Sequence, residues 1–568
     1  MKKVLLYSIV AAATLGLTGC SDFLDDNRYP LTDQTNSPEY WNNPSNVKGQ
    51  TDTFYGLFLG YGNDGGHGDF YFNTLSDDQA GNSFAQWENV NVPSSSSSWK
   101  NPWINIRHAS YVITNVSKST LTPSEKNHFL AIGRLVRAHQ YFQLVKRYGD
   151  VQWVDGVVEI SDKNVVYGKR QDRDEIMDKV LEDLNFACDN MKDGGNGEWN
   201  KDMANAMKSD ICLWEASFCK YRTQPENGKP ANEGRAKKFF EECVKASQNV
   251  INAGYTLSND YQAIYNSINL DRNPEVIFQK EYSQQTMRHS LISYTCSSTQ
   301  ISGITKDAFD AYLFKDGKPL ATTTCNKSDV GEMTKDDNGK DIYSIEKLLK
   351  ERDARLAATI DPVIFYQDMT WSRAGGMQMT SSTGYGVKKY DNITLPAEDR
   401  RNTTQNYTCA PVYWLSVVYL NYAEAKAELG ELTQEDVDNT IGKLYKRAEL
   451  PVLQINAITP DPANNMGVSD LLWEIRRCRR CELIMDNDFR YWDLVRWHKL
   501  DLLDSQKYPN ILLGANMTKA TTEIANVGGY VDGTKGKVRI YDNRQYLWPI
   551  PSGQITLNSN LEQNPLWK

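Results

Sequence analysis

One short polar segment carries the side chains of this chain that are best suited to chemistry. Residues 77–88 place Asp77, Asp78 and Asn82 near the indole ring of Trp87 in the sequence. An aromatic ring can stack on the apolar C–H face of a sugar, while carboxylates and amides bond its hydroxyl rim. The pattern therefore indicates sugar binding. The alternatives are a core position for Trp87 beneath a long loop, and turn or capping roles for the three polar residues.

Two later segments offer the same combination of rings and polar groups. Arg288 and Tyr294 follow a predicted strand that ends near Phe278, and Trp371 and Arg373 lie in a stretch rich in Gly, Met and Ser. Loops on a rigid scaffold commonly carry binding residues. We therefore take Arg288, Tyr294, Trp371 and Arg373 as further candidate ligand contacts, with a purely structural role as the alternative for each.

No residue pattern indicates catalysis. Asp77 and Asp78 are adjacent, so in an extended chain their carboxyl groups point to opposite sides and do not form a glycosidase pair. The six histidines include no pair at metal-ligand spacing, and no nucleophile or phosphate-binding motif occurs. Cys478 and Cys481 form a C-x-x-C without a second ligand pair, so we expect structural thiols. We expect no catalytic residue, no cofactor and no metal ligand, and keep a surface glycosidase as the minor alternative.

Composition narrows the class of partner. The 568 residues carry a formal net charge of −9 and include 14 Trp, 31 Tyr and 17 Phe. An acidic surface argues against nucleic acid, whose phosphates need basic patches. With so many aromatic residues some rings must be exposed, where they are useful for holding sugars.

The first residues are typical of an export signal. Lys2 and Lys3 precede an apolar stretch over residues 4–17, which is too short to span a bilayer as a mature helix. The stretch ends at Leu17-Thr18-Gly19-Cys20, which resembles the lipobox of bacterial lipoproteins, where the signal is cleaved before Cys and the thiol is acylated. We therefore expect a signal peptide over residues 1–19 and a lipid on Cys20. The acidic stretch from Asp22 to Asp26 resembles the surface-export signal of Bacteroidetes lipoproteins.

Helical periodicity dominates the rest of the chain. Thr122-Pro123-Ser124-Glu125 is a capping box with Pro at the first helical position, and Gly149 is a helix stop. Further helices are predicted over about 172–188, 203–222, 233–252, 413–429, 433–448 and 468–486. Paired helices with short stops suggest tetratricopeptide-like hairpins, although their repeat period is irregular. Each hairpin must stack on its neighbours to bury its apolar face.

Short segments spread along the chain form an ordered set. They are Arg134–Phe142 with Tyr148-Gly149-Asp150, Ala253-Gly254-Tyr255, Arg352–Arg355, Arg490–Trp497, and Trp548–Pro551 with Gln563-Asn564-Pro565. Together they resemble the SusD/RagB family of nutrient-binding lipoproteins of Bacteroidetes. The chain departs from the family where Asp486–Phe489 replace a common Glu-Gly and Gln152 replaces a common Pro. These departures concern local packing in scaffold segments.

The resemblance implies a mainly α fold, in which tetratricopeptide-like hairpins form an α-α superhelix that packs against an irregular, loop-rich lobe with short strands. It implies one unit over residues 20–568, with a helical scaffold over about 99–255 and 411–500 and a ligand lobe over about 40–98, 256–410 and 501–568. It also implies a lipoprotein anchored in the outer membrane and facing outward, which binds glycan and delivers it to a SusC-like TonB-dependent transporter. Peptide binding, as in RagB-like members, is the alternative left open.

Overall fold

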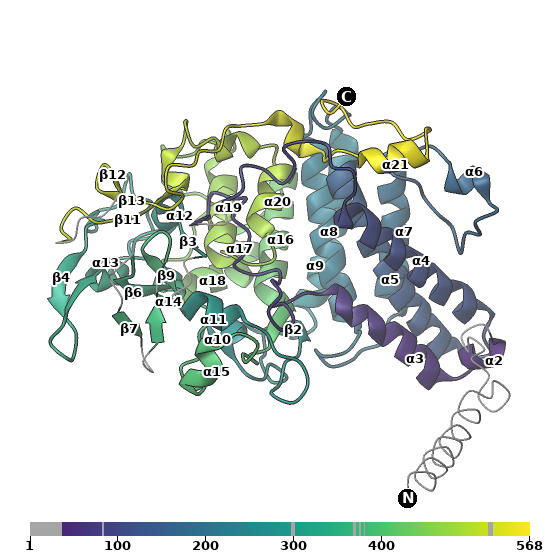
Figure 1. Cartoon of the computed structure of the whole chain (residues 1–568), viewed down its shortest axis with the longest axis horizontal. Coiled ribbons are helices and arrows are strands. Elements are labelled where there is room, and N and C mark those ends of the chain that lie inside the picture. Colours follow the sequence, from purple (N-terminus) through teal and green to yellow (C-terminus); the bar gives the residue numbers. More distant parts are fainter. Residues whose placement is uncertain are drawn as a thin grey trace, which may run out of the picture.

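The computed structural model describes residues 37–81, 84–296, 301–366, 371–373, 377–379, 381–520 and 526–568 (Figure 1). Within these ranges, the side chains of residues 296, 371–373, 377–379 and 526 are not part of the description. The expected signal peptide, the lipidation site Cys20, the acidic stretch from Asp22 to Asp26 and the candidate Asn82 lie outside the described residues. None of the helices in the described ranges has the length and apolar character needed to cross a membrane.

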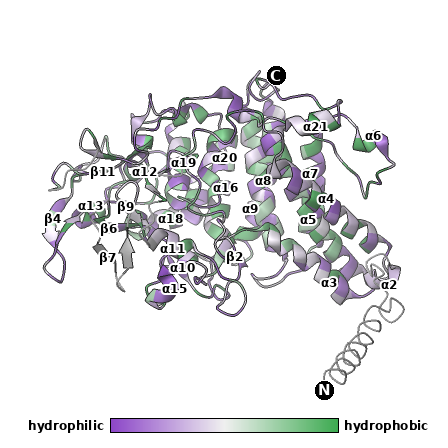
Figure 2. Cartoon of the chain, viewed as in Figure 1, coloured by the Kyte–Doolittle hydropathy of each residue, from purple (hydrophilic) through white to green (hydrophobic). Residues whose placement is uncertain are grey.

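Paired helices build one half of the molecule, at the right of Figure 1. They are α3 (Pro44–Asp52), α4 (Ser97–Lys118), α5 (Pro123–Tyr148), α7 (Arg173–Asn190), α8 (Lys201–Tyr221) and α9 (Glu233–Ile251). α4 packs on α5, α5 on α7, and α8 on α9, so successive helices form the expected hairpins. Figure 2 shows hydrophobic and hydrophilic residues interleaved along these helices. This is the pattern of amphipathic helices whose apolar stripes face a shared core.

A second group of helices continues the stack through the centre of the molecule. These helices are α16 (Leu415–Leu429), α17 (Gln434–Asn439), α18 (Ile441–Arg447), α19 (Asp470–Glu482) and α20 (Phe489–Arg496). α16 packs on α8 and α9 on one side and on α19 on the other. The two helical groups therefore share one core, although a long stretch of chain separates them.

Short strands and brief helices form the lobe at the left of Figure 1. The strands of the described chain are β1 (Gln79–Gly81), β2 (Val276–Lys280), β3 (Ser302–Ile304), β4 (Glu332–Lys335), β5 (Asp341–Ser344), β6 (Ile360–Ile364), β7 (Trp371–Arg373), β8 (Met377–Met379), β9 (Tyr385–Val387), β10 (Ala410–Trp414), β11 (Leu513–Asn516), β12 (Asn526–Val527) and β13 (Tyr530–Asp532). Of these, β2 lies near the centre of Figure 1, beside the helical half, and pairs with β10. Among them, β4-β5-β6-β9 form an antiparallel sheet, β11-β13-β12 form another, and β1-β3, β10-β2 and β7-β8 are pairs. The fold class predicted from the sequence, mainly α with a loop-rich lobe of short strands, is confirmed.

The predicted start and stop of the helix that follows Thr122 are also confirmed. Thr122 Oγ1 accepts a hydrogen bond from the Glu125 N–H (3.4 Å), and the Glu125 carboxylate accepts one from the Thr122 N–H (3.2 Å). Gly149 ends α5 with φ of 71°, a backbone angle that glycine adopts without steric cost.

Two predicted helices differ from the structure. The helix predicted over about 433–448 is divided into α17 and α18 at Thr440, whose backbone leaves the helical region with φ −125° and ψ −102°. Thr440 Oγ1 donates to the Asp436 carbonyl oxygen (2.5 Å), and such a local side-chain bond competes with the backbone ladder. The helix predicted from 413 begins at Leu415 instead, because Tyr413 and Trp414 pair with strand β2.

Candidate functional site

A glycine-rich loop, residues 59–72, is held at its base by two side chains at the end of strand β2. The Lys280 ammonium donates to the carbonyl oxygens of Phe58 and Leu59, where the loop starts. The Tyr282 hydroxyl donates to the Gly62 carbonyl oxygen (2.7 Å). Gly62 has φ of +88°, and a Cβ there would lie 2.1 Å from the Gly66 carbonyl oxygen. Only glycine allows this loop to fold back on itself so tightly.

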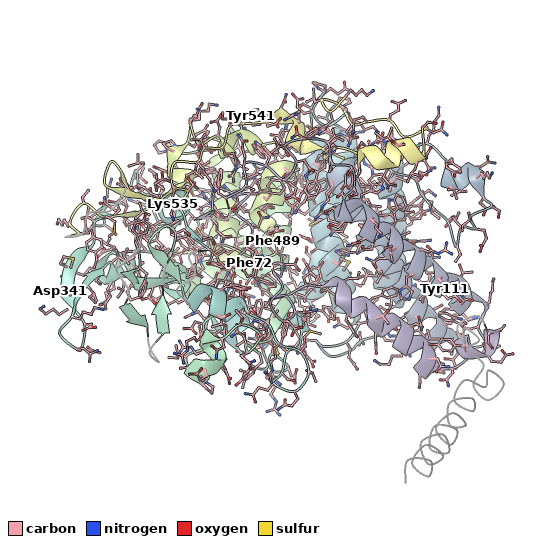
Figure 3. All side chains as sticks on the ribbon, in the orientation of Figure 1. Phe72, Tyr111, Asp341, Phe489, Lys535 and Tyr541 are labelled. Carbon is pink, nitrogen blue, oxygen red and sulfur yellow. The ribbon has the colours of Figure 1, made fainter. Side chains whose placement is uncertain are left out.

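Three rings gather where this loop meets helix α11 (Leu291–Cys296). The His67 ring stacks on Phe72, with centroids 3.8 Å apart and planes 2° from parallel. Tyr294 meets both rings edge-on, at centroid distances of 5.5 Å and 5.3 Å, and its hydroxyl donates to the Gly65 carbonyl oxygen. We call His67, Phe72 and Tyr294 the aromatic cluster, and Phe72 is labelled near the centre of Figure 3.

The aromatic cluster reaches the surface. His67 is exposed, while Phe72 and Tyr294 are half-buried. Partial burial lowers the pKa of His67, which favours the neutral ring. A neutral ring with an accessible face is the kind of group on which the C–H face of a sugar can stack.

Polar groups border the cluster on the side of Arg288. The Arg288 carbonyl oxygen accepts from the Asp64 N–H (2.8 Å), and its guanidinium donates to the Gln284 carbonyl oxygen and the Gln405 side chain. The Ser290 hydroxyl donates to the Asp64 carbonyl oxygen (2.5 Å). The structure thus brings two sequence-predicted residues, Arg288 and Tyr294, to one place beside the glycine-rich loop.

Trp371 and Arg373 lie in strand β7, which pairs with β8 in an antiparallel hairpin. Helix α11, which carries Tyr294, packs against β8. The hairpin therefore adjoins the helix of the aromatic cluster. Because the two side chains are outside the description, ligand contact by Trp371 or Arg373 stays a prediction.

Asp77 and Asp78 lie inside the protein. The Asp77 carboxylate accepts two hydrogen bonds from Arg490, both 2.7 Å, and Asp78 accepts one from Arg480 Nε (2.6 Å). Burial would raise the pKa of Asp77, but Arg480 and Arg490 outweigh it and hold the pKa well below its usual range. For Asp78, burial prevails and raises the pKa. Both oxygens of Asp77 are accounted for by Arg490, whereas Asp78 Oδ2 is buried without a hydrogen-bond partner in the described chain. Sugar binding by either residue stays a prediction.

Trp87 occupies the core, which was the structural alternative for this residue. Its side chain is 5% exposed, and Nε1 donates to the Ile540 carbonyl oxygen (2.9 Å). Arg539 approaches the ring, with 5.9 Å between guanidinium and ring centroid. A ligand would reach this indole only after the surrounding loops had moved, so a binding role for Trp87 also stays a prediction.

His67 and Phe72 were not predicted from the sequence. The available signal was the glycine spacing of residues 60–68, which surrounds a histidine and precedes three consecutive aromatic residues, Phe70-Tyr71-Phe72. Dense glycines indicate a tight backbone, but they do not reveal that Tyr294, more than two hundred residues later, closes against the same rings.

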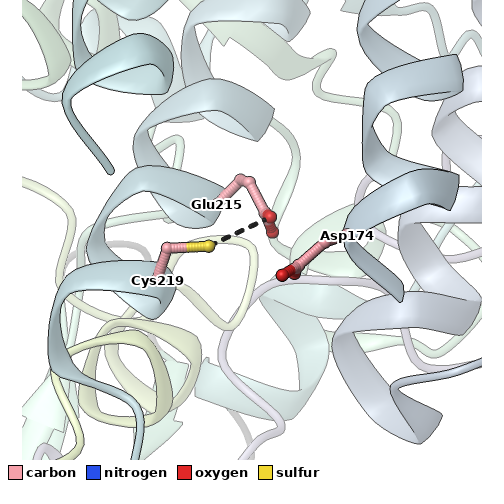
Figure 4. A group of neighbouring side chains, drawn as sticks. All are labelled: Asp174, Glu215 and Cys219. Atoms are coloured by element: carbon pink, nitrogen blue, oxygen red, sulfur yellow. Dashed lines mark hydrogen bonds between the residues drawn. The ribbon is translucent and has the colours of Figure 1, made fainter. Parts of the chain in front are cut away.

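Within the described part of the chain, one group of side chains has the composition of a metal site. Asp174, Glu215 and Cys219 bring ligand atoms within 4.8 Å of one another (Figure 4). However, Arg173 donates to Glu215 (3.1 Å) and Arg222 pairs with Asp174 (2.7 Å). Burial raises the pKa of Cys219 to about 12, so the thiol is protonated and donates to Glu215. The group is an ion-pair network in which both carboxylates already have cationic partners.

The cysteines whose side chains are described are free thiols. There are eight of them: Cys188, Cys212, Cys219, Cys243, Cys325, Cys409, Cys478 and Cys481. Cys478 and Cys481 are both buried in α19, and burial raises the pKa of Cys478 to about 11. A buried, protonated thiol is unreactive, as expected for a structural residue.

Sequence comparison identifies the family. The sequence model of the SusD family matches residues 274–567, which is more than half of the chain. The chain therefore belongs to the SusD family, as the ordered set of short segments indicated. Among curated proteins, the comparison finds no match.

Solved structures share the fold over nearly the whole chain. A SusD-like carbohydrate-binding protein of Bacteroides fragilis superposes with a TM-score of 0.69 at 20% identity, covering 92% of this chain and 100% of its own. A laminarin-binding SusD-like protein gives 0.54 at 18% identity, over 92% and 99% of the two chains. A structure with a xylogluco-oligosaccharide gives 0.55 at 17% identity, over 82% and 86%. At these identities the likeness establishes the fold.

Proposed function

We propose that this protein is a cell-surface glycan-binding lipoprotein that delivers its ligand to a SusC-like TonB-dependent transporter. The observation that carries the proposal is the aromatic cluster, in which the exposed His67 and the half-buried Phe72 of the glycine-rich loop meet Tyr294 of α11. Rings held in place lose little conformational entropy on binding, which suits repeated contacts along a sugar chain. The ligand we propose is an oligosaccharide or polysaccharide that lies across His67 and Tyr294, with Arg288 and the β7–β8 hairpin at its edge.

Relatives with the same fold support glycan as the ligand class. They include proteins described as carbohydrate-binding and laminarin-binding, and one solved with a xylogluco-oligosaccharide. We propose that binding is non-catalytic, because the sequence has no recognisable pair of catalytic carboxylates. Peptide binding is the competing ligand class and is an explicit outcome of the test below.

Affinity electrophoresis of the mature protein tests the ligand class and the site together. Gels that contain laminarin, xyloglucan or other polysaccharides should retard the wild-type protein, and the double variant His67→Ala/Tyr294→Ala should lose most of the retardation. Tyr167→Ala is the matched control, because Tyr167 is an exposed ring (47%) outside the cluster. Equal loss in the control, or retention by peptides while every polysaccharide fails, would contradict the proposal.

Two further measurements test the remaining parts. Incubation with a bound polysaccharide should release no new reducing ends, and their appearance would favour the glycosidase alternative. For the anchor, cells that express the wild-type chain should incorporate a labelled fatty acid into the protein, and Cys20→Ser should abolish the label. Digestion of intact cells with an added protease should remove the wild-type protein if it faces outward, and protection would contradict the surface location.

A further inference from the structure

A second candidate site lies between the paired helices of one half and the central helix α20. A cavity of about 440 Å³ is lined by residues of α4, α5, α8, β10 and α20 and by the start of the glycine-rich loop. Its volume is within the range of about 300–1,000 Å³ that is usual for small-molecule sites. We call it the polar cavity. It is separate from the aromatic cluster, none of whose three residues lines it.

Two neighbouring cations of α5, Lys146 and Arg147, line one wall of the polar cavity. Lys146 is 9% exposed and its Nζ lies 4.4 Å from the Trp492 ring centroid, but among the described residues it forms no hydrogen bond and no ion pair. Arg147 donates through Nη1 to Gln143, and its buried Nε has no partner in the described chain. Among the described residues, neither cation is therefore in ion-pair contact with a carboxylate.

In the described chain, the other two buried lysines, Lys208 and Lys389, have carboxylate partners. Buried arginines that lack a carboxylate, such as Arg539, donate to backbone carbonyl oxygens instead. Lys389 contacts Asp486 at 2.8 Å, and Arg496 contacts Glu424 at 2.6 Å. Burying a charge is costly unless a partner and hydrogen bonds offset the lost hydration. The unpartnered ammonium of Lys146 is thus an exception, and burial lowers the pKa of Lys146 to about 7.

The facing walls of the polar cavity are acidic. Asp69, Asp210 and Asp488 line it from the loop, from α8 and from the start of α20. In the described part of the structure none of the three is in ion-pair contact with Lys146 or Arg147, although all three act on Lys146 electrostatically. Burial raises the pKa of each aspartate, that of Asp69 to about 7. The cavity therefore has hydrogen-bond donors on one wall and acceptors on the others, held too far apart to pair directly.

The separation of donors and acceptors on different walls limits the net charge of a ligand that the polar cavity can bind. An anion would meet three aspartates, and a cation would meet Lys146 and Arg147, so a net charge of either sign is disfavoured. A molecule that both donates and accepts in many directions can bridge the walls, which is the property of a sugar's hydroxyl groups. We propose that the polar cavity binds one small, uncharged, polyhydroxylated molecule, a free mono- or disaccharide, with Lys146 donating to its hydroxyl oxygens and Asp210 accepting from its hydroxyl hydrogens. This inference does not depend on the proposed function of the aromatic cluster.

Calorimetric titration with free sugars tests the proposal. Glucose, galactose, mannose, maltose and cellobiose serve as neutral probes, and glucuronate and glucosamine serve as charged ones. At least one neutral probe should bind the wild-type protein, and Lys146→Met should weaken its binding about tenfold or more, because the hydrogen bond from Lys146 Nζ is lost and the sugar hydroxyl that faces Met has no donor. Asp210→Asn, which keeps the side-chain size, should weaken the same probe and covers the case in which Lys146→Met fails to fold.

These experiments test the aromatic cluster and the polar cavity independently of each other. His67→Ala/Tyr294→Ala should leave the cavity titration unchanged, and Lys146→Met should leave polysaccharide retention unchanged. The proposal is wrong if no neutral probe binds, if glucuronate or glucosamine binds more tightly than every neutral sugar, or if neither Lys146→Met nor Asp210→Asn alters the titration.

Discussion

The protonation state of His289, in the lobe, is determined by its buried hydrogen-bond partners. His289 follows Arg288 directly and is fully buried (0% exposed). Its Nε2 lies 3.1 Å from the Thr408 carbonyl oxygen, and its Nδ1 accepts from the Leu291 N–H (3.2 Å). These contacts require a neutral ring with the proton on Nε2, because a second proton on Nδ1 would point at the Leu291 N–H. Burial accordingly lowers the pKa of His289 to about 3.

This shift predicts a specific pH dependence of stability. The unfolded chain takes up a proton on this histidine below about pH 6.5, whereas the folded protein does so only near pH 3. The contribution of neutral His289 to the free energy of unfolding is therefore fully present above pH 6.5. It is lost as the pH falls below that value, by about 1.4 kcal/mol per pH unit. Urea denaturation measures the free energy of unfolding at pH 7.5 and at pH 5.0. Between these two pH values, the free energy of unfolding should fall by about 2 kcal/mol less in His289→Gln than in the wild-type protein.

The matched control for this prediction is His67→Gln. The His67 ring is exposed, so this variant should keep most of the wild-type pH dependence. If His289→Gln has the same dependence as the wild-type protein, His289 is not the neutral buried group that its contacts indicate.

At the scale of an element, local signals determine where helices begin. The first N–H groups of a helix have no partner within the helix, and a capping side chain bonds one of them. Thr122 has this role for α5, whose carboxyl-terminal half carries Lys146 and Arg147 of the polar cavity. The start of α5 is thus fixed by its own sequence, without help from distant residues.

Removal of this cap should loosen the first turn of α5. Thr122→Ala is expected to cost about 1 kcal/mol, which corresponds to roughly a fivefold faster amide exchange in that turn. Hydrogen exchange followed by mass spectrometry on peptides from this region measures the effect. Thr120→Ala is the control, because Thr120 is exposed and its hydrogen bond to Asn42 uses the backbone N–H. Equal exchange in both variants would mean that Thr122 does not cap the helix.

The fold could be predicted from the sequence where the determining signals are local, and not where they depend on residues far apart in the chain. Signals that act within one or two turns, such as the Thr122 box and Gly149, predicted α5 correctly. The role of Asp77 was not predictable in this way, because its partners Arg480 and Arg490 lie about four hundred residues further along the chain. A carboxylate in a polar segment has the same local sequence whether it faces a ligand or a buried guanidinium.

Across the whole molecule, the segment around Asp77 joins parts of the chain that are remote in sequence. Asp77 pairs with Arg490 of α20 and Asp78 with Arg480 of α19, while Arg539 donates to the Thr74 carbonyl oxygen (2.7 Å). Lobe, central helices and carboxyl-terminal segment therefore meet at one buried network. This supports the proposal that the mature chain is a single unit rather than a scaffold with a separable lobe.

Neutralising Asp77 should therefore destabilise the molecule as a whole. Asp77→Asn leaves Arg490 buried without a carboxylate, and breaking a buried pair costs about 3–5 kcal/mol. Asp307→Asn is the control, because Asp307 also contacts Arg480 (2.9 Å) but its side chain is 34% exposed, and it should cost less than about 1 kcal/mol. Urea denaturation, followed by tryptophan fluorescence and by far-ultraviolet circular dichroism, should show one transition that shifts together for both signals. Separate transitions would contradict the single unit, and full stability with weaker polysaccharide retention would make Asp77 a ligand contact after all.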